Sequence, residues 1–302
     1  MSLTSATTSA PDASTRRAPK QRRSWAWLGV VPFFAFLVIF LIAPALSVFQ
    51  KALFDSDGNF GVDALKNAFT GQNRAAFVFS VKLSALSAFV GVVVGGLLAY
   101  TASTLRRPRW LRTFISSFSG VAANLGGVPL AFAFLALLGR QGLLTRIIND
   151  GLGVDIYRSG FALDSTAGFV FVYSYFNIPL MVLITLPAVD GLKDSWREAC
   201  ANLGGTSWTF WRRVGLPVLT PALLGGFLLL FANSFSAFAT AAALTTKSTL
   251  VPLRIGFYLG GDFSSTGEQQ LGYSLAAWMM IIMVVNMGIY YVLRRRSERW
   301  QQ

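Results

Sequence analysis

Six long stretches of the chain contain no Asp, Glu, Lys or Arg, and together they hold more than half of its 302 residues. A helix that crosses a bilayer needs about 20 mostly apolar residues, because each residue rises about 1.5 Å through a hydrocarbon core about 30 Å thick. All six stretches are long enough, so the pattern predicts an all-α, polytopic membrane protein with six transmembrane helices. The stretches are residues 25–49, 83–105, 113–139, 165–189, 214–246 and 269–293.

Composition favours the same class. Hydrophobic residues make up 54% of the chain and charged residues 13%, whereas soluble domains have about 45–50% and about 25%. A soluble protein would need six long, wholly apolar helices without amphipathic partners to cover them, which is a poor alternative.

The fifth stretch has 33 residues and is too long for one simple span. It opens with Gly215, Leu216 and Pro217, and Pro221 follows. We therefore expect an interfacial elbow at its start and a membrane helix over residues 222–244.

The basic residues predict the orientation. With a cytoplasmic N-terminus, the inside segments hold 17 of the 26 Lys and Arg residues but only five of the 13 Asp and Glu residues. Short cytoplasmic loops of membrane proteins carry such an excess of Lys and Arg. We expect both termini in the cytoplasm, and the net charge of +13 then indicates contact with anionic lipid and not with nucleic acid.

The chain ends are expected to be simple. Residues 2–15 contain eight Ser and Thr and a basic cluster follows, which predicts a disordered cytoplasmic tail over residues 1–24. Ala43-Pro44-Ala45 resembles a signal-peptide cleavage site, but the apolar stretch before it exceeds the usual ~7–15 residues, so we expect a retained first helix. Residues 25–295 are then one six-helix domain, and residues 296–302 a cytoplasmic C-terminal tail.

Catalytic and metal chemistry finds little support in the sequence. The chain has no His and one Cys, Cys200, which excludes a Cys/His zinc or haem site and a His-based triad. We expect no catalytic residue and no bound metal. The spans also lack the ionisable residues that ion-coupled transporters place in the membrane, although backbone carbonyls could bind Na⁺, so a secondary transporter or channel remains an alternative.

Pairs of glycines recur inside the predicted spans. Small residues allow close approach of helix backbones in membranes, so we expect tight helix packing at these pairs. They are Gly95-Gly96, Gly126-Gly127 and Gly225-Gly226.

One cytoplasmic loop, residues 190–217, predicts a helix–turn–helix. Ser195 and Glu198 have the spacing of a capping box at the first helix start. Gly204 and Gly205 fit a left-handed helix end, and Thr206 can cap the second helix. We expect Pro217 to stop that second helix.

Aromatic residues gather in this loop: Trp196, Trp208, Phe210 and Trp211. Exposed aromatics on a short helical knob are typical of a protein contact. Trp is equally common at the membrane interface, so both interpretations stay open.

The loop resembles a motif of permease subunits from binding-protein-dependent ABC importers, the EAA motif E-A-A-x3-G-x9-I-x-L-P. The spacing is intact, with Cys in place of the second Ala and Val in place of Ile. The matching residues are Glu198, Ala199, Cys200, Gly204, Val214, Leu216 and Pro217.

The resemblance implies a permease subunit in the inner membrane of a bacterial cell. In such importers the loop forms a coupling helix that docks on a cytoplasmic ATPase. Two ATPase subunits, a second permease, identical or homologous, and an extracytoplasmic solute-binding protein complete the assembly. ATP and Mg²⁺ would be bound by the partner ATPase, and this sequence contains no Gly-Lys dipeptide and therefore no phosphate-binding G-x4-GK loop.

Uncharged polar residues within the spans are the candidates for a substrate pathway, because a buried amide in lipid needs a partner or a wet cavity. Interhelical hydrogen bonding is the alternative role for each. The fifth stretch and residues 124–142 most resemble permeases of the spermidine/putrescine group, with iron(III), sulfate and phosphonate as alternative substrates. The pathway candidates are Asn124, Asn177, Asn233, Ser234, Ser236 and Thr240.

The orientation is testable with reporter fusions. Because the basic residues favour a cytoplasmic N-terminus, fusions at Asn59, Gly153 and Asp262 should report an outside location. Fusions at Arg109, Gly205 and Gln302 should report an inside location. A reversed pattern at two or more sites would contradict the predicted topology.

Overall fold

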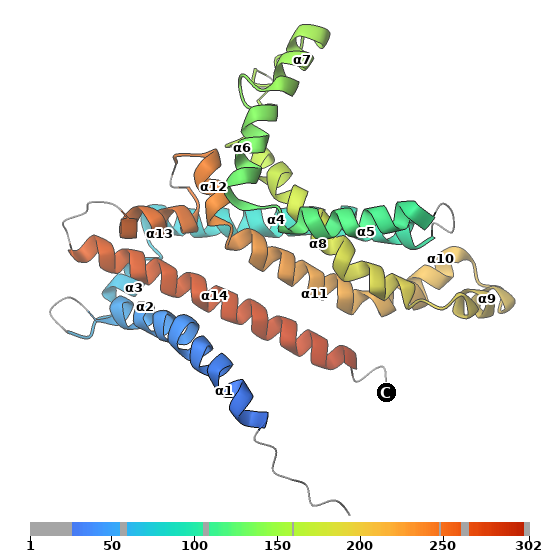
Figure 1. The fold of residues 1–302 in the computed structure, drawn as a ribbon, viewed down its shortest axis with the longest axis horizontal. Helices are drawn as coiled ribbons and strands as arrows, with labels where there is room; N and C mark the ends of the chain where they lie inside the picture. Colours follow the sequence, from blue (N-terminus) through green and yellow to red (C-terminus); the bar gives the residue numbers. More distant parts are fainter. Residues whose placement is uncertain are drawn as a thin grey trace, which may run out of the picture. The chain divides into compact units, whose positions relative to one another are not determined.

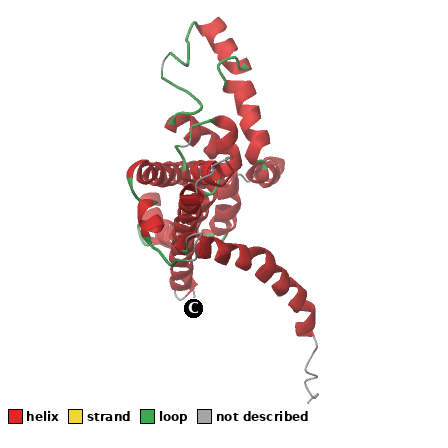
Figure 2. Cartoon of the chain, turned by 90° about the vertical axis from the view of Figure 1, so that its left-hand side faces the viewer, coloured by secondary structure: helices red, strands yellow, loops and turns green. Residues whose placement is uncertain are grey.

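The computed structural model describes residues 26–54, 59–104, 109–158, 160–247, 249–260 and 266–298. Figure 2 shows that this part of the chain is helical, and the bridge between Phe54 and Phe60 is the only β pairing within it. The predicted all-α class is confirmed. The tail predicted over residues 1–24 lies outside the described residues, and so do residues 299–302.

The described helices are labelled in Figure 1. Two π-helical turns, η1 (Val38–Ile42) and η2 (Trp211–Gly215), interrupt otherwise α-helical segments. The α-helices are α1 (Ala26–Leu37), α2 (Ala43–Leu53), α3 (Asp63–Asn67), α4 (Gly71–Thr104), α5 (Arg109–Asn124), α6 (Gly127–Leu138), α7 (Leu143–Leu152), α8 (Thr166–Asp190), α9 (Asp194–Asn202), α10 (Ser207–Phe210), α11 (Leu216–Phe235), α12 (Phe238–Leu244), α13 (Val251–Gly260) and α14 (Thr266–Glu298).

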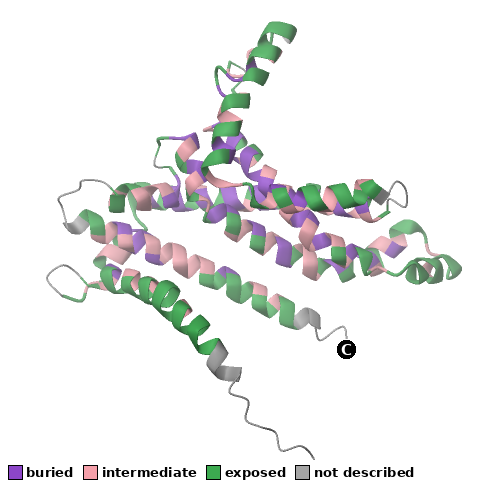
Figure 3. Ribbon diagram, viewed as in Figure 1, coloured by how far each residue is buried: buried purple, intermediate pink, exposed green. Residues whose placement is uncertain are grey.

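The chain divides into two compact units, residues 1–47 and 48–302. The described residues of the first unit form α1, η1 and the start of α2, and none of their described side chains is buried. The second unit contains the buried core of the described chain, which follows α4, α8 and α11 in Figure 3.

Within the described residues, six segments are long and apolar enough to cross a membrane, the number that the charge-free stretches predict. Their bounds are Val30–Leu53, Gly71–Thr104, Gly127–Gly151, Thr166–Asp190, Ser207–Phe235 and Glu268–Arg295.

The prediction of one helix over residues 113–139 is wrong. The chain breaks after Asn124 and starts again at Gly127, whose φ of +74° lies in the left-handed region. Helix α5 packs along α8, whereas α6 packs against α12, so the two halves diverge (Figure 1). A Cβ on Gly126 would meet nothing, so this glycine pair serves a turn and not the tight packing we expected.

The elbow and the helix start at residue 222 are also wrong. Helix α11 begins at Leu216 and contains Pro221, and it ends at Phe235, where Ser236 and Ala237 separate it from α12. Pro217 lies at the start of α11, where a proline is tolerated, and Pro221 lies about one turn further inside the helix. The break near residue 236 carries no proline or glycine, so the sequence pattern does not reveal it.

Helix α4 begins 12 residues before the predicted start at Leu83. A 34-residue helix is about 51 Å long and exceeds the ~30 Å hydrocarbon core. Lys82 is exposed within the added part. A charged residue therefore ends the apolar stretch here without ending the helix.

Small residues bring α4, α8 and α11 close together. A Cβ on Gly91 would lie 2.9 Å from Cβ of Asn177 and 2.5 Å from Leu230, and one on Gly95 would lie 2.7 Å from the carbonyl oxygen of Ile178. On α11, a Cβ on Gly226 would lie 2.5 Å from Sδ of Met181. The tight packing predicted at Gly95 and Gly226 is confirmed, because no real side chain fits at these distances.

We predict that Gly95→Ala destabilises the protein and that Gly96→Ala does not. Both changes raise helix propensity, but at Gly96 the nearest atom to an added Cβ is 3.6 Å away. Overpacking at Gly95 should cost about 1–3 kcal/mol and lower the thermal midpoint in detergent. Equal midpoints for the two variants would contradict the close approach of α4 and α8.

Candidate functional site

Two helix breaks lie together in the second unit. One separates α5 from α6, and the other separates α11 from α12. Thr240 Oγ1 accepts a hydrogen bond from the Gly127 N–H at 3.0 Å and lies 3.3 Å from the Gly127 carbonyl oxygen, to which it donates. Tyr173 Oη donates to the Ala237 carbonyl at 3.2 Å. Non-helical backbone at membrane depth requires such partners or a wet cavity.

The six predicted pathway residues divide into two groups by burial. Asn177, Ser234 and Thr240 are buried, with at most 3% of each residue exposed. Asn177 Nδ2 donates to Ser234 Oγ at 2.8 Å and joins α8 to α11. These three contact other helices of the same chain and form no open surface.

The other three residues, Asn124, Asn233 and Ser236, are exposed on the second unit. Asn124 Nδ2 donates to the Gly120 carbonyl at 2.8 Å, and Ser236 Oγ donates to the Ala232 carbonyl at 2.9 Å. All three lie at or within three residues of a helix break. They therefore present polar groups beside the irregular backbone.

The predicted helix–turn–helix is confirmed and forms a knob of α9 and α10. Gly204 has a φ of +76°, and its N–H donates to the Ala201 carbonyl at 2.9 Å. The Gly205 N–H donates to the Cys200 carbonyl at 2.9 Å, which completes a Schellman helix end. Thr206 Oγ1 accepts from the Thr209 N–H at 3.3 Å and caps α10, as predicted.

The predicted capping box at Ser195 and Glu198 is wrong. Helix α9 begins at Asp194, and its N-cap residue, Lys193, makes no side-chain capping bond. Ser195 is thus already inside the helix. The S-x-x-E spacing is short and occurs without a cap, so it is a weaker signal than the glycine pair.

Pro217 does not stop the second helix. The chain passes from α10 through η2 into α11, and the Leu216 N–H bonds to the Trp211 carbonyl five residues back. This wider turn leads into a helix with Pro217 at its start, where a missing N–H is tolerated. The knob and α11 are therefore joined without a loop.

The predicted aromatic face is only half exposed. Trp208 is 71% exposed and Trp196 38%, but Phe210 is buried beneath the Arg197 guanidinium, which lies 5.3 Å from its ring centroid. Trp211 packs edge-to-face on Tyr100 of α4 at 5.0 Å. Phe210 therefore packs inside the knob, and Trp211 fastens the end of the knob to α4.

Three of the seven motif residues line one groove, and the other four do not line it. Ala199, Cys200 and Val214 line one groove of about 580 Å³, which Leu203 borders. Glu198, Gly204, Leu216 and Pro217 are exposed. Leu203, 88% exposed, was missed by the sequence reasoning because a leucine beside a glycine turn is unremarkable in an apolar chain.

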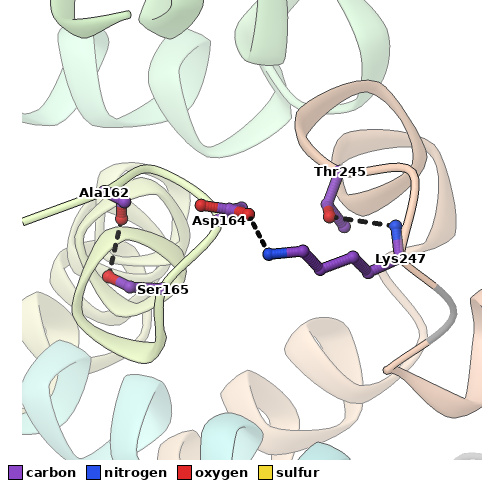
Figure 4. Close-up of polar contacts among 5 residues, drawn as sticks. All are labelled: Ala162, Asp164, Ser165, Thr245 and Lys247. Atoms are coloured by element: carbon purple, nitrogen blue, oxygen red, sulfur yellow. Dashed lines mark hydrogen bonds and ion pairs between the residues drawn. The ribbon is translucent and has the colours of Figure 1, made fainter. Parts of the chain in front are cut away.

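An ion pair links the loop before α8 to the loop after α12 (Figure 4). Lys247 Nζ lies 2.8 Å from Asp164 Oδ2, and this hydrogen bond lowers the pKa of the Asp164 carboxyl. Ser165 Oγ donates to the Ala162 carbonyl at 2.6 Å and accepts from the Gly168 N–H as the cap of α8. Asp164 and Lys247 are the charges that bound the fourth and fifth apolar stretches, which is the signal that could have found them.

The fold and these sites define a class: a helical membrane protein with interrupted helices and a short helical knob between two spans. The family model described as binding-protein-dependent transport system inner membrane component matches residues 91–299. The chain belongs to this family and is an inner-membrane permease of the binding-protein-dependent ABC type. This finding displaces the ion-coupled transporter as the alternative.

Named relatives serve several substrates. The putative ferric transport system permease protein FbpB 1 of Haemophilus influenzae is 24% identical over 87% of this chain and 42% of its own length. ModB of Mycobacterium tuberculosis, a molybdenum transport system permease, is 30% identical over 56% of this chain and 61% of its own length. The chain thus spans about half the length of these two relatives. The spermidine/putrescine permease PotB of Haemophilus influenzae is 22% identical over 89% of this chain and 95% of its own length.

A solved structure shares the fold. A bacterial alginate ABC transporter, crystallised in complex with an alginate pentasaccharide-bound periplasmic protein, contains a chain with a TM-score of 0.67 to this one. The two chains are 19% identical, and the match covers 92% of this chain and 95% of that chain.

We predict a small, pH-dependent loss of stability in Asp164→Asn. Because the folded pKa of Asp164 lies below its ordinary 3.8, the pair contributes fully above that value, and its contribution disappears as the pH falls through the folded pKa. The partly exposed pair should be worth about 0.2–1 kcal/mol. The thermal midpoints of Asp164→Asn and the unmodified protein should differ at pH 7 and converge at low pH.

Asp63→Asn is the matched control, since its carboxylate is 88% exposed and lies 3.9 Å from Lys66. Its midpoint should match the unmodified protein at both pH values. A midpoint difference for Asp164→Asn that persists at low pH would contradict an ionic origin.

Proposed function

We propose that this chain forms half of a translocation pathway and couples it to a separate ATPase through the α9–α10 knob. The continuous path from α10 through η2 into α11 carries this proposal. A displacement of the knob would move α11 as one body, because no loop absorbs it. The knob exposes Leu203 and Trp208, which gives an ATPase groove an apolar surface to bind.

The pathway is proposed to run along the exposed residues Asn124, Asn233 and Ser236. Polar groups beside interrupted helices are typical of transport sites in membranes, and they are unfavourable against lipid. A second permease, placed opposite this face, would enclose them. The buried residues Asn177, Ser234 and Thr240 then hold the helices together instead of contacting substrate.

The proposed substrate is a polyamine such as spermidine or putrescine. PotB supports it, since the match extends over nearly its whole length. The exposed polar residues near the breaks are neutral, and the six charge-free stretches contain no carboxylate to select a cation. An extracytoplasmic binding protein would therefore make the selection, and the same pathway suits iron(III), sulfate or phosphonate delivered by another binding protein.

Thiol labelling tests the pathway. In a Cys200→Ala background, Asn233→Cys and Ser236→Cys should react with a small hydrophilic thiol reagent, because they face a wet cavity. Ser234→Cys, buried one residue away, should not react. Val284→Cys, 70% exposed on apolar α14, is the lipid-facing control. Reactivity of Ser236→Cys no greater than that of Val284→Cys would refute a wet pathway at this face.

Substitution of Gly204 tests coupling. Gly204→Val should reduce both ATPase co-purification and substrate uptake at least several-fold, because a β-branched residue is strained at a φ of +76°. Gly204→Asn is the matched control, since Asn tolerates this conformation, and it should retain most of both activities. Wild-type ATPase recovery and uptake in Gly204→Val would contradict a coupling role for the knob.

A further inference from the structure

A large groove lies beside the knob and shares Trp196 and Val218 with the groove of about 580 Å³. The last turns of α8, the first half of α11 and the end of α14 enclose about 1270 Å³. Pockets for small molecules usually have about 300–1,000 Å³, so this groove has room for a long flexible chain.

Missing side chains create the groove. Ala188, Gly191, Ala222 and Gly225, which carry a methyl group or no side chain, lie along its walls. A Cβ added to Gly225 would lie 3.1 Å from the Tyr290 ring, so this ring is the nearest wall on the α14 side. The interior is apolar apart from Thr220, whose hydroxyl donates to the Leu216 carbonyl.

The rim of the groove is basic and aromatic. Lys193 and Arg294 both border it, and its lining contains no acidic residue. Trp196 and Tyr290 border the same groove, and Lys193 Nζ lies 6.0 Å from the Trp196 ring centroid. Trp and Tyr favour the headgroup depth of a bilayer, which places this rim at a membrane surface.

We propose that the groove binds one anionic phospholipid of the cytoplasmic leaflet, with an acyl chain between α8, α11 and α14 and the phosphate at Lys193 and Arg294. The cytoplasmic placement of the rim rests on the proposed function. That leaflet carries the anionic lipids, and each basic residue near its surface attracts them. The negatively charged phosphate complements the positive charge of this rim, since Lys193 and Arg294 border the groove and no acidic residue lines it.

The lipid would support the knob. Lys193 is the residue directly before α9, and Trp196 lies in its first turn. Bound phosphate would hold Lys193 beside the end of α14, and so set the direction in which α9 leaves α8. Coupling between the ATPase and the spans would then depend on anionic lipid.

Photoactivatable phosphatidylglycerol, with a diazirine at the acyl end, tests this in nanodiscs that contain the assembled transporter. Mass spectrometry of the digested protein should find the label on groove residues of α8, α11 or α14. Excess phosphatidylglycerol should compete, and phosphatidylcholine should not. Lys193→Gln/Arg294→Gln should lower groove labelling roughly tenfold or more, since the phosphate loses both basic partners.

Arg212→Gln/Arg295→Gln is the matched control, because it removes two exposed charges that do not line the groove. It should label like the unmodified protein. Ala222→Phe fills the groove and should abolish labelling inside it, with circular dichroism confirming the helical fold.

An equal loss of groove labelling in both double variants would mean that basic residues attract the lipid non-specifically, and it would overturn the proposal. Labelling that phosphatidylcholine competes equally, or that persists in Ala222→Phe, would overturn it as well. A cross-link between the groove and a span of the second permease, found in place of lipid, would also overturn the proposal. Labelling requires no transport, so its failure would leave the permease assignment standing.

Discussion

The close approach of α4, α8 and α11 is the contact on which the rest of the second unit depends. Lipid removes the hydrophobic force between membrane helices, so van der Waals contact and buried hydrogen bonds must hold them together. Glycines at 91, 95 and 226 permit this contact, and the Asn177–Ser234 hydrogen bond lies in the same junction. Helix α11 is thereby held along its length, with the knob before it and a break after it.

This arrangement connects α11 at one end to the knob and at the other end to the helix break. At one end, η2 joins it to α10, and Trp211 packs on Tyr100 of α4. At the other end, Ser236 and Ala237 interrupt the helix, and Tyr173 and Thr240 supply hydrogen bonds to the irregular backbone at the two breaks. A 20-residue helix spans about 30 Å, the thickness of the hydrocarbon core, so one rigid element connects the knob with the proposed pathway.

The sequence predicts the features that depend on composition and on local backbone requirements. Charge-free stretches reveal six spans because ionised side chains are costly in lipid. The glycine turn at Gly204 is predictable because few other residues adopt its φ. The break after α11 is not, since Ser236 and Ala237 are ordinary in a helix and the bond to the Ala237 carbonyl comes from Tyr173 of α8, distant in sequence. Burial of Asn177 and exposure of Asn233 likewise depend on neighbouring helices, which one charge-free stretch cannot show.

The central claim is that the α9–α10 knob binds a separate ATPase. A photo-crosslinking amino acid at Leu203, 88% exposed on the knob, tests it in cells of the native host, with Val154, exposed in the loop after α7, as the control position. Mass spectrometry should identify an ATPase with a G-x4-GK loop cross-linked at position 203 and not at position 154. Absence of any such ATPase at position 203, or equal recovery from both positions, would contradict the account.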